Sequence, residues 1–346
     1  MATAFGAPIA SRAPVLPPLS ILDLAPVAEG STTAEALRNC LDLAAQADAL
    51  GYRRYWVAEH HNMEGVASSA TAVLIGQLAA VTRRLRVGSG GIMLSNHAPL
   101  TIAEQFGTLA ELYPGRIDLG VGRAPGTDRP TMRALRRSLE GAGEDSFPND
   151  VLELQGYLAP ASPDAAVRAV PGQGTEVPIW LLGSSLYSAQ LAAYLGLPFA
   201  FASHFAPSQL MQALQVYRHT YRPSARHPEP HAIVAVNVIV APTDEEAQFL
   251  FTSIQQRFLG MVRGRRGKLP QPVANLQALW SPTEAAQVAG MLAESIVGTP
   301  DVVRAGLAAT HARTGADEFI VASAVHDHGR RQHSYALLAE LAGLSG

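Results

Sequence analysis

Short apolar runs alternate with longer amphipathic stretches along most of the chain. The runs are bounded by turn residues, as strands are, and the stretches between them carry apolar side chains at helical spacing. This alternation predicts an α/β protein with a parallel sheet. The predicted strands are Leu19–Leu24, Tyr52–Ala58, Leu85–Gly90, Ile117–Val121, Val177–Leu182, Phe199–Ala202, Ala232–Val240 and Glu318–Ala322.

The stretch after the first predicted strand carries the clearest helix signals. Thr32 and Glu35 have the spacing of a capping box, and Gly51 is a typical helix stop. Apolar or small residues form a stripe between them, at Leu37, Cys40, Leu41, Ala44 and Ala47. Further helices are predicted from Ser68 or Ser69, over Leu100–Tyr113 and Leu186–Leu195, and around Ser334–Leu344.

Eight strands in order, each followed by a helix, match the (β/α)8 TIM barrel. The alternative is a doubly wound open sheet, which usually carries a G-x-G-x-x-G fingerprint after its first strand. The first predicted strand here ends in Asp23-Leu24-Ala25-Pro26, without that fingerprint. We therefore predict one barrel over residues 18–346, preceded by a flexible lead-in over residues 1–17.

Two segments interrupt the even spacing, residues 125–176 and residues 260–298. The second includes a basic run, Arg263, Arg265, Arg266 and Lys268. Long irregular segments in compact domains are usually functional lids or disordered. We expect both to be inserted loops at the C-terminal face of the strands, with the basic run either solvated or binding an anion.

Composition removes several classes of protein. Apolar residues make up 48% of the 346 residues, enough for a sizeable core, which excludes a disordered chain. Only 16% of residues are charged and the net charge is −3, so we expect no nucleic-acid partner. The single cysteine, Cys40, excludes a disulfide framework and a cysteine-based metal site.

Membrane and export signals are also missing from the pattern. The longest uncharged stretch, Val177–Tyr217, is interrupted by Pro178, Gly183 and Pro198. Its pieces are shorter than the roughly 20 residues that a spanning helix needs. The N-terminus has no apolar segment typical of a signal peptide. We therefore expect a cytoplasmic protein with no membrane partner.

In a TIM barrel the active site lies at the C-terminal ends of the strands, so polar residues just past each predicted strand are candidates. Gly183-Ser184-Ser185 leads from the fifth strand into a helix, whose N-terminal N–H groups favour anions. Arg123 follows the fourth strand and offers a bidentate countercharge. Together they suggest a phosphate site; Ser184 or Ser185 acting only as a helix N-cap is the alternative.

Glycines and histidines follow the second and third strands. Gly90 and Gly91 indicate a bulge that lets a flat ligand approach the backbone, or a plain turn. His60, in Glu59-His60-His61, is placed for a general base near neutral pH, for metal binding or for a surface loop. A metal-dependent hydrolase would gather further ligands, for which the candidates are His97, His204 and His326. No strand end offers an obvious lone carboxylate ligand, and we predict no metal.

Five stretches together resemble the bacterial luciferase-like flavin-dependent monooxygenases. The specific combination is Glu-His-His after the second strand with Pro114-Gly115-Arg116 and Arg123 around the fourth. The resemblance implies a (β/α)8 barrel that binds FMN, usually reduced, at the strand ends. The matching stretches are Gly51–Asn62, Leu85–Phe106, Leu112–Asp128, Trp180–Phe205 and Gly298–Leu307.

The resemblance also implies roles for single residues. His60 matches the catalytic base or stabiliser of the flavin intermediate. Gly90 and Gly91 match the pair under the isoalloxazine ring, often joined by a non-prolyl cis peptide. Arg123 matches the arginine that grips the FMN phosphate. Ser185 and Ser188, with Ser184 beside them, match the rest of the phosphate site. Ser184 and Gly122 replace a glutamate and a reactive cysteine of the luciferases, which argues against light emission and aldehyde specificity.

The implied reaction uses reduced FMN and O₂, through a flavin C4a-hydroperoxide, to oxidise a small organic substrate. Electrons would come from a separate flavin reductase or, indirectly, from NAD(P)H, and the resemblance implies a homodimer. Two alternatives share the fold: a deazaflavin- or NAD(P)H-linked hydride-transfer dehydrogenase, and a flavin-binding barrel without catalytic activity. The pattern does not identify the substrate.

Overall fold

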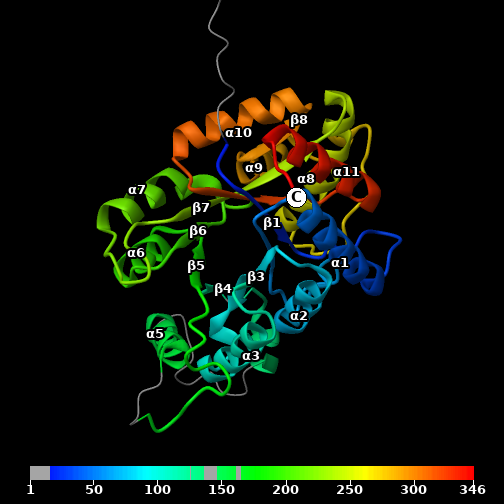
Figure 1. Ribbon diagram of the computed structural model, residues 1–346. Helices are drawn as coiled ribbons and strands as arrows, with labels where there is room; N and C mark the ends of the chain where they lie inside the picture. The colour runs from blue at the N-terminus through cyan, green and yellow to red at the C-terminus, as the bar shows by residue number, and fades with distance from the viewer. Residues whose placement is uncertain (1–15, 125, 136–145, 161–164) are drawn as a thin grey trace, which may run out of the picture.

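The computed structural model describes residues 16–124, 126–135, 146–160 and 165–346. Most of the expected lead-in over residues 1–17 thus lies outside the described residues. The strands close into a parallel barrel in the order β1-β2-β3-β4-β5-β6-β7-β9 and back to β1, with helices around them (Figure 1). This confirms the (β/α)8 TIM barrel. The strands are β1 (Leu19–Asp23), β2 (Arg54–Val57), β3 (Arg86–Met93), β4 (Ile117–Gly122), β5 (Ile179–Gly183), β6 (Phe199–Phe201), β7 (Ala232–Val240), β8 (Ser295–Gly298) and β9 (Glu318–Ala322).

The helices fill the connections between these strands. They are α1 (Thr33–Leu50), α2 (Thr71–Val81), α3 (Pro99–Leu112), α4 (Arg129–Leu135), α5 (Phe147–Leu158), α6 (Leu186–Leu195), α7 (Leu210–Thr220), α8 (Asp244–Val262), α9 (Pro282–Met291), α10 (Pro300–Thr314) and α11 (His328–Ala342). Short 3₁₀ turns lie at η1 (Leu94–Asn96), η2 (Pro207–Gln209) and η3 (Leu276–Ala278). None of the helices in the described ranges is both long and apolar enough to cross a bilayer.

The local signals at α1 act as predicted. Thr32 is the N-cap, and its side chain and that of Glu35 form the reciprocal capping box. Gly51 ends the helix in the left-handed conformation, with φ of 85°. Cys40 and Ala44 of the predicted stripe are buried, so the helix packs this face on the barrel.

The eight predicted strands are present as β1–β7 and β9, with ends that differ by a few residues. Strand β8 was not predicted, because it is only four residues long, is mostly partly exposed and carries no strand pattern. It pairs with the second half of β7, over Asn237–Val240, whereas the first half of β7, over Ala232–Val234, pairs with β6. Residues 260–298 are therefore not irregular throughout, since they also contain α9.

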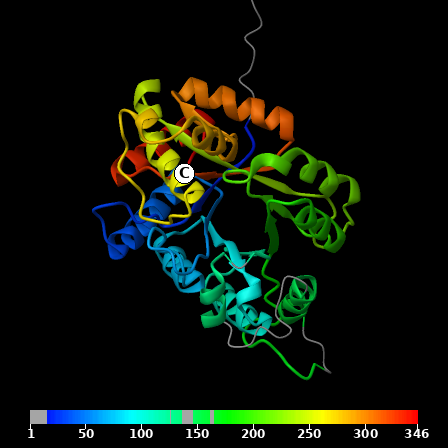
Figure 2. The ribbon, with the colours of Figure 1, turned by 180° about the vertical axis from the view of Figure 1, so that it is seen from behind.

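The segments predicted as insertions lie in different places. Helix α5, from residues 125–176, packs against α3 in the outer helical layer (Figure 1). Residues 260–298 instead reach the end of β1, because Leu269 pairs with Ala28 and the ammonium of Lys268 donates to the carbonyl of Ser31. Seen from behind in Figure 2, this yellow and orange segment runs beside the blue loop that follows β1.

Three separate apolar clusters hold the molecule together. The largest lies between the barrel and its helices. A second fills the barrel interior, where the rings of Trp56 and Trp180 meet edge to face at 5.4 Å. The third lies between α8, α9 and β7 and includes Leu250, Ile254 and Val288. The layer formed by α8, β8 and α9 thus has its own core beside the barrel.

An ionic cluster closes the barrel interior at the N-terminal ends of the strands. Arg54 precedes Trp56 by two residues and so points inward with it. The Arg54 guanidinium contacts Asp118 at 2.7 Å and Glu318 at 2.9 Å, and all three side chains are buried. Burial lowers the pKa of Arg54, but the two carboxylates outweigh it and raise the pKa above its usual value.

Candidate active site

The predicted site residues lie at the C-terminal ends of four neighbouring strands. His60 follows β2, Gly90 and Gly91 lie within β3, Arg123 follows β4, and the three serines begin at the end of β5. Neighbouring strands are about 4.8 Å apart, so β3 and β5 are separated by about 10 Å. The residues thus line one continuous arc of the barrel mouth.

The environment of His60 fixes its protonation. Its Nδ1 lies 3.3 Å from the carbonyl oxygen of Gly126, an acceptor, so Nδ1 carries the hydrogen and Nε2 is left as the basic atom. Burial lowers the pKa of His60, and the positive charges of Arg257 and Arg266 lower it further. The imidazole is therefore neutral near pH 7 and able to accept a proton.

The neighbouring Glu59 anchors the loop that carries His60. One Glu59 oxygen lies 2.7 Å from His61 Nε2 and 2.8 Å from His97 Nε2, and the other accepts the backbone N–H of Met93 at 3.0 Å. Burial would raise the pKa of Glu59, but these hydrogen bonds outweigh it and the pKa is lowered. Glu59 thus ties the end of β2 to the end of β3.

His204 lies on the loop after β6. Burial lowers the pKa of His204 to about 4, and a charge on His60 also lowers it, so this ring is neutral as well. Its Nδ1 is buried and has no hydrogen-bond partner among the described residues. The side-chain amide of Asn237 donates to the His204 carbonyl at 2.6 Å and ties this loop to β7.

The four histidines considered as metal ligands do not meet at one point. His97 contacts Glu59, and Nε2 of His326 contacts the carbonyl of Glu29 at the rim. Within the described ranges, the one set of three potential ligand atoms close together is Glu59, His61 and His97. Both oxygens of Glu59 accept hydrogen bonds there, and this network joins the ends of β2 and β3.

The predicted phosphate end brings β4 and β5 together. The Arg123 guanidinium lies over the ring of Tyr187, 4.3 Å from its centroid, at the first turn of α6. Ser185 is the N-cap of α6, and the Ser188 hydroxyl donates to the Ser185 carbonyl at 2.8 Å. Ser188 is buried and takes part in the helix cap. Ser184 and Ser185 remain partly exposed, next to the end of β4, which Arg123 follows.

The glycine pair on β3 forms the bulge that the sequence predicts. The Gly90–Gly91 peptide bond is cis, and the β3–β4 register shifts between Ser89 and Ile92. A Cβ on Gly90 would lie 2.7 Å from Leu22 Cδ1, and one on Gly91 would lie 2.8 Å from the carbonyl oxygen of Gly120. The barrel core itself requires glycine here, and a ligand at the mouth would meet bare backbone.

These features fit FMN. Arg123 and the N-terminus of α6 offer a guanidinium, hydroxyls and backbone N–H groups to a phosphate. The bare backbone at Gly90–Gly91 offers a flat surface two strands away, a separation comparable to the ribityl arm. His60 follows β2, the strand that pairs with β3.

Several residues of this mouth have no signal in the sequence. Gly126 fixes the tautomer of His60 from a loop after β4, and the side-chain amide oxygen of Gln209 accepts the N–H of Leu186 at the start of α6. Arg257, on α8, acts on His60 from far along the chain. Only the folded barrel brings these segments together, so local spacing does not reveal them.

Known proteins match the chain over nearly all its length. A family model described as luciferase-like monooxygenase matches residues 18–318. A luciferase-like monooxygenase of Escherichia coli (strain K12) is 56% identical over 93% of this chain and 96% of its own. The N-acetyl-S-alkylcysteine monooxygenase of Bacillus subtilis (strain 168) is 35% identical, over 93% of this chain and 97% of its own.

A solved structure is also similar. The crystal structure of apo-MsnO8 superimposes with a TM-score of 0.88 at 39% identity, covering 96% of this chain and 99% of the other. The similarity therefore extends through the barrel and its inserted segments.

Proposed function

The chain belongs to the luciferase-like monooxygenase family, and we propose that it is an FMN-dependent monooxygenase acting on a small organic substrate. The observation that carries the proposal is the arc from β2 to β5. It joins a neutral histidine of fixed tautomer, a bare backbone surface and an anion-binding helix end.

Bound in its reduced form, FMN would supply the electrons that activate O₂, so that one oxygen atom enters the substrate and the other leaves as water. Arg123 and the α6 N-terminus would hold the phosphate. His60 would accept or return a proton at Nε2, because Gly126 keeps the hydrogen on Nδ1. The layer formed by α8 and α9 would limit water at the mouth.

Both FMN and a deazaflavin occur in chains of this fold. The oxygenating constituent of a 3,6-diketocamphane monooxygenase is solved in complex with FMN (TM-score 0.71, 18% identity). An F420-dependent secondary alcohol dehydrogenase is solved with an F420-acetone adduct (TM-score 0.63, 13% identity). We favour FMN because the relative named as a monooxygenase is 35% identical over nearly the whole chain. A separate reductase or NAD(P)H as electron source, a cytoplasmic location and a homodimer belong to the same proposal.

The test is a titration of the purified protein with FMN, oxidised and reduced, and with F420, followed by absorbance and fluorescence. We expect FMN to bind and F420 to bind at least tenfold more weakly. Arg123→Met should weaken FMN binding about tenfold to a hundredfold, since a charge-assisted hydrogen bond contributes about 1.5–3 kcal/mol.

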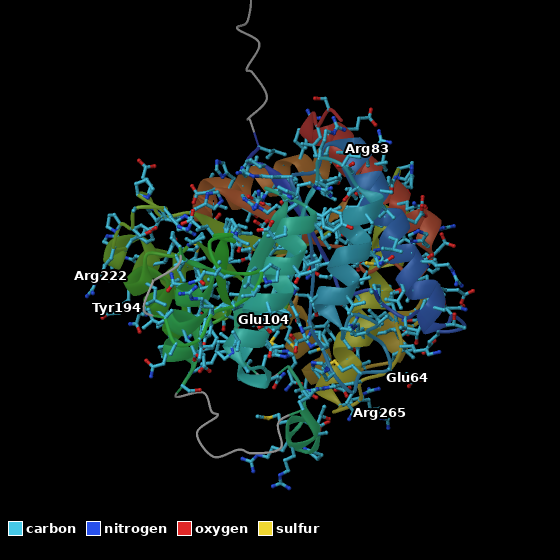
Figure 3. The ribbon with its side chains drawn as sticks, turned by 60° about the horizontal axis from the view of Figure 1, so that its bottom comes forward. Glu64, Arg83, Glu104, Tyr194, Arg222 and Arg265 are labelled. Carbon is cyan, nitrogen blue, oxygen red and sulfur yellow. The ribbon has the colours of Figure 1, made fainter. Side chains whose placement is uncertain are left out.

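The matched control is Arg222→Met, which removes an arginine that also lies over a tyrosine ring, Tyr194, at 4.2 Å but at the surface (Figure 3). FMN affinity should not change in this variant. Tighter binding of F420 than of FMN would overturn the cofactor assignment, and unchanged FMN affinity in Arg123→Met would overturn the phosphate site.

A further inference from the structure

Arg257 occupies a position on α8 that packing would assign to an apolar residue. Leu250, Ile254 and Arg257 stand at the i, i+4 and i+7 positions of one helix face. Leu250 and Ile254 are buried in the core between α8 and α9. Arg257 is half-buried. A charged residue in such a stripe normally has a partner for its charge.

Within the described part of the chain, the Arg257 guanidinium forms no hydrogen bond, ion pair or ring contact. Burial lowers its pKa, and no carboxylate of the described residues opposes that effect. The fully buried arginines differ: Arg54 is paired with Asp118, and Arg331 contacts Asp23 at 2.7 Å. A half-buried cation without a counterion costs free energy that an incoming anion would recover.

The end of α8 that carries Arg257 lies towards the barrel mouth: the neighbouring Gln256 donates to the carbonyl of Gln271 at 2.8 Å, in the segment that pairs with the loop after β1 at Leu269. Besides burial, the charge of Arg257 also lowers the pKa of His60. Ser253 lies one helical turn before Arg257 and so on the same side of α8. Ser253 is fully buried, and its hydroxyl has no hydrogen-bond partner among the described residues; the same holds for Nδ1 of His204. Unsatisfied polar groups from α8 and from the loop after β6 thus accompany the unpaired arginine.

The FMN phosphate would not use this cation. Its proposed site is formed by Arg123 after β4 and by the N-terminus of α6 after β5. Arg257 comes from the layer that follows β7 and approaches the histidine at the other end of that arc, at β2. A ligand held by Arg257 would therefore be a molecule that also meets His60.

We propose that Arg257 binds a carboxylate of the organic substrate and so selects anionic substrates. This inference rests on the proposed function, because it needs a substrate at His60. Arg257 is a specificity-determining residue in this scheme: its contact with the carboxylate would hold the oxidisable part of the molecule beside His60.

The test compares carboxylates with neutral amides of the same size. Binding of butanoate, octanoate and 3-phenylpropanoate, and of the corresponding amides, is measured by calorimetry on the full chain, with and without oxidised FMN. At least one carboxylate should bind the wild type about tenfold or more tightly than its amide, and Arg257→Met should reduce this ratio to below about twofold. Arg257→Lys should keep part of the preference, because the charge remains.

Arg265→Met is the matched control. Arg265 lies in the basic run that follows α8, is exposed and sits at the periphery of the molecule (Figure 3), so its loss should leave the preference intact. Methionine suits the apolar face of α8, and we expect Arg257→Met to fold with an unchanged melting temperature. Arg257→Gln replaces it if that temperature falls.

The outcomes separate the two proposals. FMN binding with no preference for any carboxylate, or with the same preference in Arg257→Met, overturns this inference and leaves the proposed function standing. Failure of the wild type to bind FMN overturns the proposed function, while the measurements without FMN still decide whether Arg257 binds carboxylates.

Discussion

Two regions of the molecule treat buried charge in opposite ways, the Arg54 cluster at the N-terminal ends of the strands and the surroundings of Arg257 at the mouth. At the N-terminal ends of the strands, Arg54 contacts Asp118 and Glu318, and a hydroxyl from Ser20 also donates to Glu318. At the C-terminal ends, Arg257 and Nδ1 of His204 have no partners among the described residues.

The difference separates stability from function. Removing one member of a closed buried network leaves the remaining charges uncompensated and lowers the free energy of unfolding. Open polar groups contribute little to folding but are ready for a ligand. We therefore expect substitutions at the N-terminal end to change the free energy of unfolding, and substitutions at the mouth to change binding and rate.

The largest effect on stability is expected from Arg54→Met. It removes the buried cation between Asp118 and Glu318 and leaves them only the more exposed Arg86 and Arg53, which should lower the free energy of unfolding by about 3 kcal/mol. Urea denaturation measures it. Arg53→Met is the control, because the Arg53 side chain is 46% exposed and lies 3.5 Å from Glu318, so its loss should cost at most about 1 kcal/mol. Equal losses in the two variants would show that burial of the Arg54 ion pairs does not set the stability of this end.

A substitution at the mouth should do the reverse. His60→Asn keeps an N–H for the Gly126 carbonyl but removes the basic Nε2, so substrate oxidation should fall by about 100-fold or more. The melting temperature and FMN affinity should stay near wild type. His326→Asn, at the rim where the side chain is half-buried, should also leave the melting temperature and FMN affinity near wild type. Near-normal turnover in His60→Asn would exclude the proton role.

The smallest expected effect concerns pH. His204 has a folded pKa of about 4, below its usual 6.5, so protonation favours the unfolded chain and stability falls as pH drops from 6.5 towards 4. Glu318 has a lowered pKa, so its contribution is lost only below about 4.5.

Urea denaturation across this range should show both windows. In His204→Asn, the loss of stability between pH 6.5 and 4.5 should be smaller by on the order of 1 kcal/mol, because the side chain is partly exposed. The loss of stability below pH 4.5 should remain. If the slope between pH 6.5 and 4.5 is unchanged in that variant, His204 is not the titrating group.

The barrel was predictable because its signals are local. Each strand from β1 to β7, and β9, is an apolar run with its own boundaries, and the α1 capping box lies within four residues. Strand β8 was missed because its four residues carry no strand pattern of their own. It forms through its contacts with α8 and β7, which are distant in the sequence.

Site residues were predictable only where they lie at or just after the ends of predicted strands. His60, Arg123 and the glycine pair follow or end predicted strands, so the fold brings them to one edge. Their assignment to FMN stays a prediction. Arg257 was not predictable, since a helical arginine without a nearby acid is usually solvated, and only the three-dimensional packing of α8 shows otherwise.

The split pairing of β7 has a consequence for how this protein diversifies. Because β7 is shared, first with β6 and then with β8, the α8–β8–α9 layer is attached to the barrel but has its own apolar core. Mutations in residues 244–298 therefore alter one wall of the mouth with little effect on packing of the barrel interior. Exchange of this layer between relatives would be a direct route to engineered substrate preference, with the arc from β2 to β5 left untouched.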